Sequence, residues 1–163
     1  MERSYSAVAD AVRLSPADAR LANEAGSILA RYLQRDADAA ERYLSRAVEI
    51  LLSQLSALRS AAADPGLGKD ERERRETALE QAEIALGDAY SNLGLVYLDL
   101  KEDPLGARAW LEKSARTGPD PREEITGPGG LLAQCDALQK GGRNPKARER
   151  TRWASPITPE RKP

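Results

Sequence analysis

The residues that could do chemistry in this chain are few, and they lack the partners that catalysis needs. The sequence contains no histidine, so the usual general base and the commonest metal ligand are both missing. Its single cysteine, Cys135, lies on an apolar helical stripe, which predicts a buried structural thiol rather than a nucleophile. One cysteine also excludes an internal disulfide and a cysteine-cluster metal site. We therefore predict no catalytic residue, no metal and no cofactor.

A glycine-rich segment and many carboxylates are the remaining candidates for chemistry. The segment Gly127-Pro128-Gly129-Gly130 precedes an expected helix, as a phosphate-binding loop does, but no Lys-Ser or Lys-Thr pair follows it and no strand precedes it. The carboxylates alternate with Lys and Arg on expected helix surfaces, as Glu71 does with Arg75, which is typical of a solvated face. We interpret the glycine-rich segment as a loop and expect that the protein is not an enzyme.

A pattern of small and large residues occurs twice and predicts two pairs of closely packed helices. The two copies are residues 23–29 with 40–50, and residues 91–97 with 107–114. In each copy a small residue on the first helix precedes, by a little over a dozen positions, a small-xxx-Leu-xx-small pattern on the second. Small residues let two antiparallel helices approach closely, and the leucine fills the space between them. Such a unit cannot bury its apolar face alone, so it stacks on neighbours and presents a surface.

At these residues the chain resembles a tetratricopeptide repeat protein. The residues that follow the family's order of small and large positions are Leu93-Gly94, Tyr97, Ala107, Leu111, Ser114 and Pro119. The first copy resembles the variety found in kinesin light chains and many bacterial relatives. Ala40 and Ala107 lie 67 residues apart, close to twice the family's period of roughly 34 residues. Each copy carries one or two more residues between its helices than the family pattern does.

The resemblance implies a right-handed, all-α stack of about five or six antiparallel-paired helices with a concave groove lined by the first helix of each pair. Six residues are brought toward that groove: Asn23, Ser27, Asp88, Ser91, Asn92 and Leu95. Amide hydrogen bonds and helix-in-groove or extended contacts could hold a protein partner there. Ser91 and Asn23 stand where some family members have lysines that clamp a C-terminal carboxylate, so binding of chaperone tails is disfavoured. The alternative is that the six residues are ordinary surface.

Apolar periodicity predicts helices along residues 1–140 and no strand. Tyr5, Val8 and Val12 predict a short first helix, and Ser15-Pro16 predicts the start of the second, which ends near Arg35. Asp36 or Asp38 is expected to cap the third helix. Its predicted buried stripe is Ala40, Leu44, Ala47, Leu51, Leu55 and Leu58.

The segment Asp64–Gly68 predicts a break, after which a long helix begins with charged residues. Its predicted buried positions are Leu79, Ala82, Leu86, Tyr90, Leu93, Tyr97 and Leu100. Asp103-Pro104 is expected to start the next helix, which extends to about Arg116, and Pro119–Gly130 is expected to be a loop. Leu131, Leu132, Cys135 and Leu138 predict a last short helix that covers the open end of the stack.

Charge divides the chain into a helical domain, residues 1–140, and a basic tail, residues 141–163. The tail has seven Lys and Arg against two acids, a net charge of +5, so the helical domain carries −6. Its expected contact residues are Arg143, Lys146, Arg148, Arg150, Arg152 and Trp153. The tail could grip phosphates and stack on a base, lie in an acidic groove of another protein, or wrap back on its own domain. Nucleic acid is possible through the tail but is not favoured.

The composition narrows the function to a few classes. Hydrophobic residues make up 40% of the chain, aromatic residues only 4%, and phenylalanine is absent, which favours a Leu- and Ala-rich core of close-packed helices over a β-sandwich. No secretory signal and no apolar stretch of about 18 residues is visible, so we expect a cytoplasmic protein without a membrane span. We predict a non-catalytic protein–protein interaction adaptor or assembly scaffold. The alternative is a structural subunit of a large complex whose basic tail docks on a neighbouring protein or on nucleic acid.

Overall fold

Helices and the turns between them make up the described part of the protein. The computed structural model describes residues 2–64, 66–118 and 123–141, and this part contains no strand. The elements in order are α1 (Glu2–Leu14), α2 (Ala19–Ser27), the π-helical segment η1 (Ile28–Leu33), α3 (Ala37–Ala62), α4 (Lys69–Leu95), the π-helical segment η2 (Val96–Leu100), α5 (Pro104–Ala115), α6 (Glu123–Thr126) and α7 (Leu131–Gln139). Counting each π segment with the helix that it extends, six helices in these ranges have nine residues or more. The all-α prediction is confirmed.

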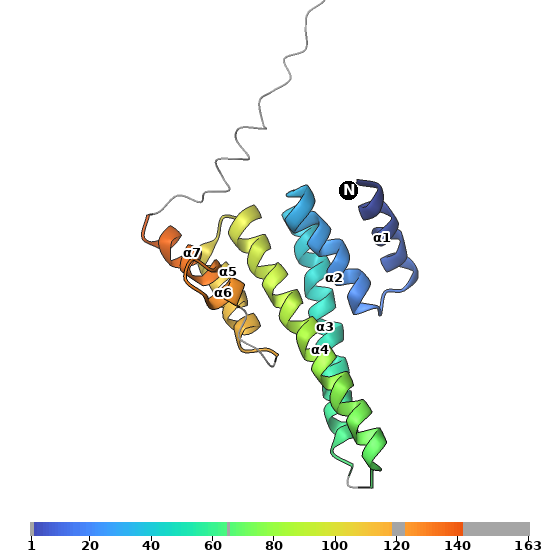
Figure 1. The fold of residues 1–163 in the computed structure, drawn as a ribbon. Helices are drawn as coiled ribbons and strands as arrows, with labels where there is room; N and C mark the ends of the chain where they lie inside the picture. Colours follow the sequence, from blue (N-terminus) through green and yellow to red (C-terminus); the bar gives the residue numbers. More distant parts are fainter. Residues whose placement is uncertain (1, 65, 119–122, 142–163) are drawn as a thin grey trace, which may run out of the picture.

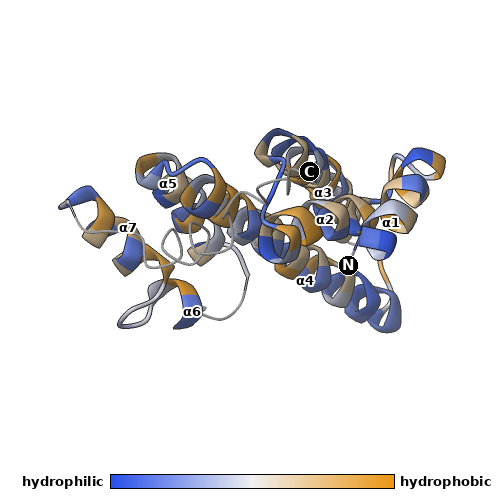
Figure 2. Cartoon of the chain, turned by 90° about the horizontal axis from the view of Figure 1, so that it is seen from above, coloured by the Kyte–Doolittle hydropathy of each residue, from blue (hydrophilic) through white to orange (hydrophobic). Residues whose placement is uncertain are grey.

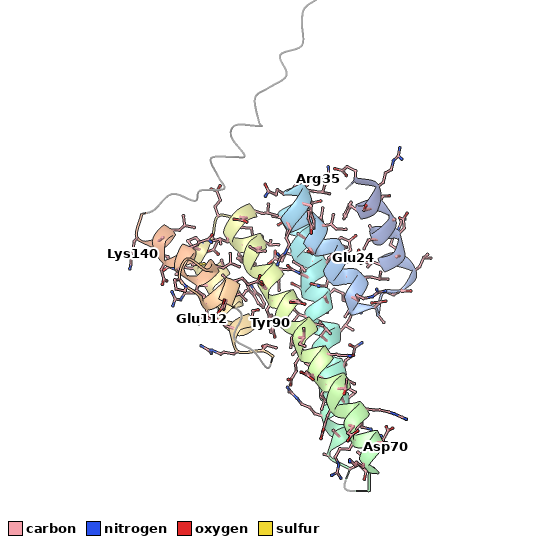
Figure 3. The ribbon with its side chains drawn as sticks, viewed as in Figure 1. Glu24, Arg35, Asp70, Tyr90, Glu112 and Lys140 are labelled. Atoms are coloured by element: carbon pink, nitrogen blue, oxygen red, sulfur yellow. The ribbon has the colours of Figure 1, made fainter. Side chains whose placement is uncertain are left out.

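The helices pack in the order in which they follow one another along the chain. Helix α2 packs on α3, α3 on α4, α4 on α5 and α5 on α7, while α1 lies against α2 at the other end (Figure 1). Helices α3 and α4 run on together as a hairpin that projects beyond the rest of the molecule (Figure 1). Asp70 marks the tip of this projecting hairpin in Figure 3. No helix within the described ranges is both long and apolar enough to cross a membrane.

The two predicted helix pairs make the same close contact. A Cβ placed on Gly26 would lie 2.5 Å from Leu44 Cγ, and a Cβ on Gly94 would lie 2.6 Å from Leu111 Cγ. Both leucines are completely buried. Only glycine leaves room for the leucine branch point at this distance, so the glycine–leucine pair determines how closely each second helix approaches the first.

The ends of the first helices also repeat. In each pair the first helix continues into a π-helical segment, where Gln34 N–H bonds Leu29 C=O and Lys101 N–H bonds Val96 C=O, five residues back. A π turn takes up an extra residue within a helix. The additional residues noted between the paired positions of the sequence are accommodated in this way.

A left-handed residue and an aspartate cap then connect the two helices of each pair. Gln34 (φ 47°) and Glu102 (φ 54°) have left-handed backbones. Asp36 and Asp103 follow as N-caps, and each accepts a hydrogen bond of 3.0 Å from the backbone N–H three residues later. The predicted cap at Asp36 and the predicted restart at Asp103 are therefore confirmed.

Leucine and alanine dominate the core, as the composition predicts. In α3 the stripe Ala40, Leu44, Ala47, Leu51 and Leu55 is buried and Leu58 is half-buried. Of the positions predicted to be buried in α4 and η2, Leu86, Tyr90 and Leu93 are buried, and Leu79, Ala82, Tyr97 and Leu100 are half-buried. Hydrophobic residues concentrate where α2, α3 and α4 meet (Figure 2). A second cluster around the fully buried Cys135 joins α5, α6 and α7.

Two local predictions are wrong. Helix α2 is capped by Asp18, whose Oδ1 accepts hydrogen bonds from the backbone N–H groups of Arg20 (2.9 Å) and Leu21 (3.2 Å), and not by Ser15. Ser15 and Pro16 lie in the turn before α2, and the side chain of Asp18 caps the helix instead. The segment expected to be only a loop contains the short helix α6, which the buried Ile125 anchors. The predicted contact residues of the tail lie outside the described residues.

Candidate functional site

The two π-helical segments lie next to each other and line a hollow of about 330 Å³, here called the π hollow. Its lining residues are Ala30, Arg31, Tyr32, Gln34, Leu95, Asp99, Glu124 and Leu131. Four of them come from η1 and its C-cap, two from the end of α4 and η2, and one each from α6 and α7. The first helices of both pairs thus meet the C-terminal helices at this place.

A chain of hydrogen bonds fixes the guanidinium of Arg31 at the π hollow. Arg31 Nε donates to Asn92 Oδ1 (2.8 Å), and Asn92 Nδ2 donates to Asn23 Oδ1 (3.1 Å). Because a guanidinium can only donate, Asn92 must turn its oxygen toward Arg31 and its nitrogen toward Asn23. Asn92 is 4% exposed, so water does not compete well for these bonds. The amide thereby joins η1, α2 and α4 and orients the arginine.

The π hollow combines apolar and charged groups. Ala30, Leu95 and Leu131 supply apolar surface. The charged side chains are the exposed Arg31 and Glu124 and the buried Asp99. Tyr32 is 61% exposed, more than any other aromatic side chain in the described part of the protein. A few polar groups around an apolar floor are typical of a binding site. The lining residues include the Tyr32 hydroxyl and the carboxylates of Asp99 and Glu124, but no serine, cysteine or lysine.

The six predicted groove residues do not share one groove. Leu95 lines the π hollow, whereas Asn23 and Asp88 line a second and larger hollow near the start of α2. Ser27 is half-buried, and Ser91 and Asn92 are buried. The reason is the hydrogen bond between Asn23 and Asn92, which holds α2 and α4 together and closes the space between them. A role in partner binding stays a prediction for these residues.

Most of the residues around the π hollow were not predicted. Arg31 and Tyr32 belong to a π-helical segment, and periodicity based on 3.6 residues per turn cannot assign a face to such a segment. Glu124 belongs to α6, a helix within the segment that was expected to be a loop. One signal of the π segments is present in the sequence. It is the one or two additional residues that follow Gly26 and Gly94, the glycines of the repeated pattern.

A second polar network joins α3 to η2. Tyr97 donates from its hydroxyl to Glu41 Oε1 (2.5 Å), and Lys101 Nζ donates to Glu41 Oε2 and lies 5.0 Å from the centre of the Tyr97 ring. The hydrogen bond from Lys101, and then that from Tyr97, lowers the pKa of Glu41. The hydrogen bond to Glu41 raises the pKa of both Lys101 and Tyr97. The ion pair of Lys101 with Glu41 thus links the first helix pair to the end of η2 in the second.

An aromatic cluster continues this network onto α5. The Tyr90 ring stacks on Trp110 with centroids 5.8 Å apart, and Lys113 Nζ lies 4.0 Å from the centre of the Trp110 ring. Figure 3 places Tyr90 on the side of α4 that faces α5. The rings of Tyr90 and Trp110 and the ammonium group of Lys113 contact one another, so we assign the cluster a structural role.

Neither cysteine chemistry nor metal binding finds support in the geometry. Burial raises the pKa of the Cys135 thiol, which keeps it protonated and unreactive. Within residues 2–64, 66–118 and 123–141, no three Cys, Asp or Glu side chains are grouped as metal ligands would be.

Comparison of this protein with models of protein families, with curated proteins and with solved structures finds no match.

Proposed function

We propose that the protein is a non-catalytic interaction adaptor or assembly scaffold of the tetratricopeptide type, and that it holds a segment of a protein partner in the π hollow. The observation that carries this proposal is the meeting of two π-helical segments around one hollow. Such segments are rare, and where they occur they are frequently at functional sites. Here they come from equivalent places in two similar helix pairs, and the first of them, η1, carries the exposed side chains of Arg31 and Tyr32.

The repeated local structure supports the repeat-protein part of the proposal. Both pairs share the glycine–leucine contact, the π segment, the left-handed residue and the aspartate cap. Stacked helix pairs bury their faces against each other and leave extended surfaces for partners. A buried amide that orients an exposed arginine is a preorganised contact, which lowers the entropic cost of binding.

The chemistry of the π hollow suits a peptide that has an apolar side chain and a polar backbone or carboxylate nearby. Leu95 and Leu131 would receive the apolar side chain. Arg31 would donate to a carbonyl or a carboxylate, because the guanidinium keeps free N–H groups after its Nε is used by Asn92. Tyr32 would add the contact area of a ring, as tyrosines do at many protein interfaces.

Affinity purification from the native organism with matched variants tests the proposal. Tyr32→Glu changes an exposed ring in the π hollow, and Leu105→Glu changes an apolar side chain that is 68% exposed on α5 and does not line the hollow. We expect one partner to be retained by the wild type and by Leu105→Glu and lost with Tyr32→Glu, while circular dichroism is unchanged in both variants. Retention of the same partner by Tyr32→Glu would exclude the π hollow as its site.

Two further outcomes would change the functional class. An integral subunit of a large complex would co-purify with many proteins in fixed stoichiometry and would lose none of them with Tyr32→Glu. Reproducible turnover by the purified chain, abolished by a point change at a defined residue, would overturn the non-catalytic part of the proposal.

A further inference from the structure

Helices α3 and α4 extend past the start of α2. One face of the α3–α4 hairpin is therefore covered by α2 in the body of the molecule and is open between the start of α2 and the tip of the hairpin. The resulting groove has a volume of about 1110 Å³ and is here called the hairpin groove. The buried Ala19 and Leu51 lie at its end nearest α2, where the interface of α2 with α3 begins. The groove thus continues the interface of α2 with α3 and α4. Figure 1 shows that the α3–α4 hairpin runs on beyond the start of α2.

Small apolar residues form the walls of the hairpin groove. They are Ala57, Leu58 and Ala61 on α3, and Ala78, Ala82 and Ala85 on α4. Five of the six are half-buried and Ala57 is exposed, and each alanine side chain allows another helix to come close. The solvated part of the hairpin lies beyond this groove, where Lys69–Glu76 is charged at every position. The hairpin groove is therefore an apolar surface next to a charged tip.

The polar residues of the hairpin groove have a definite order. Asp18, Arg20 and Asp88 are the charged residues among its lining, and all three lie at the end nearest α2. Gln54 and Gln81 lie between this charged end and the alanines nearest the tip, Ala61 and Ala78. The middle of the groove is therefore uncharged, and both of its amides are exposed.

We propose that the hairpin groove is a dimerisation surface, into which a second copy of this chain lays its own hairpin in antiparallel orientation about a two-fold axis. In a two-fold interface each patch meets its own copy, so the residues near the axis must be compatible with themselves. A glutamine amide satisfies this condition because it carries both a donor and an acceptor. Gln54 and Gln81 of one copy can therefore pair with the same residues of the other, without like charges across the axis.

The two ends of the groove differ in the size of their side chains. Leu14 is 85% exposed and directly precedes Ser15, which lines the end nearest α2. In the antiparallel arrangement this end of one copy lies over the tip end of the other. Leu14 then faces Ala61 and Ala78, whose small side chains leave room for a leucine. One molecule thus carries both the projecting side chain and the place that receives it.

A contact of this kind is expected to be weak. Stable interfaces bury about 1,600 Å² in total, and a single pair of two-helix hairpins offers a smaller, mostly alanine-lined surface. We therefore expect association that depends on protein concentration in the micromolar range or above, and not a permanent dimer.

The test is the oligomeric state of the full chain, measured by sedimentation equilibrium over a series of concentrations. We expect the wild type to pass from monomer to dimer as its concentration rises. Gln81→Glu and Gln81→Lys should each raise the dissociation constant at least about tenfold, because both place like charges across the axis. An equimolar mixture of the two variants should associate again, since opposite charges then face each other.

Gln139→Glu on α7 is the matched control, because it makes the same chemical change at an exposed helical position outside the groove. It should dimerise as the wild type does, and circular dichroism should be the same for all variants. Leu14→Ser should weaken the dimer without changing the fold. A wild type that stays monomeric at every concentration overturns the proposal. A dimer that tolerates both Gln81 variants overturns it as well.

Discussion

Gly94 on α4 lies against Leu111 on α5 so closely that an added Cβ would be 2.6 Å from the leucine Cγ. A Cβ and a carbon atom of another side chain do not come this close without being bonded, so a side chain here would force one of the helices to move. The atom in question is the branch point of a fully buried leucine rather than the end of a flexible side chain. Gly26 and Leu44 have the same relationship in the other pair, and each contact holds a π-bearing helix on its partner.

Gly94→Ala should therefore destabilise the protein, although alanine is the better helix former. Overpacking a core costs roughly 1–3 kcal/mol, and the gain in helix propensity offsets up to about 1 kcal/mol of this. We expect a net loss of about 1–2 kcal/mol in the free energy of unfolding, measured by urea denaturation. The double variant with Leu111→Ala is the control, because it removes the overlap. Its loss should be smaller than the sum of the two single losses, and strict additivity would show that the two residues do not collide.

Two buried serines provide a matched pair for a second prediction. Ser114 Oγ donates to Gly87 O (2.6 Å), whereas Ser91 Oγ is buried and has no hydrogen-bond partner in the described part of the protein. Both serines are helical, so replacement by alanine brings the same gain in propensity. Ser91→Ala should be more stable than Ser114→Ala by about 1–2 kcal/mol, because only the latter loses a hydrogen bond. Equal stabilities in thermal unfolding would contradict this assignment.

A third prediction concerns the ion pair between Glu41 and Lys101. The two side chains are 28% and 27% exposed, so Glu41→Gln should cost about 1 kcal/mol at neutral pH. The lowered pKa of Glu41 means that its stabilising effect is complete above the ordinary glutamate pKa of about 4.3 and is lost as the pH falls through the lower native value. Unfolding curves of the wild type and the variant should thus differ by a constant amount at neutral pH and converge in acid. A difference that persists at pH 2 would show that the carboxylate charge is not responsible.

The local elements of this fold were largely readable from the sequence, because local chemistry determines them. Asp36 and Asp103 cap helices through their own side chains. The spacing of Gly26 and Gly94 to the leucines of the following helices predicts the close helix contacts. The error at Ser15 has the same local origin, since Asp18 offered a competing cap three residues later.

The candidate site was harder to predict, because it depends on how the helices meet. Arg31 reaches the π hollow through a π-helical segment, and the burial of Asn92 follows from its bonds to residues more than 60 positions away. The hairpin groove exists because α3 and α4 are longer than α2, a difference in length whose consequence appears only when the helices are placed side by side. The periodicity of apolar residues in a single sequence does not show which helices meet or how far one helix extends past another.

The last prediction is that residues 142–163 act independently of the helical domain. The apolar pattern ends at Leu138, and α7 ends at Gln139 with Cys135 as its buried anchor. Deleting residues 142–163 should therefore leave helix content and thermal stability almost unchanged. Any binding of an acidic partner by this basic segment should fall steeply with salt, because each neutralised charge releases counterions.

Replacing Arg148, Arg150 and Arg152 together should weaken that binding, and Trp153→Ala should weaken it further if the ring is buried in the complex. Binding of a peptide in the π hollow should respond less to salt, because Arg31 is the one basic side chain among its lining residues, whereas the basic segment carries seven. A marked drop in melting temperature after the deletion would show instead that the basic segment folds back on the acidic helical domain, whose net charge of −6 complements its +5. Melting curves of the full and shortened chains at low and high salt separate these outcomes, since an intramolecular ion-paired contact would contribute stability only at low salt.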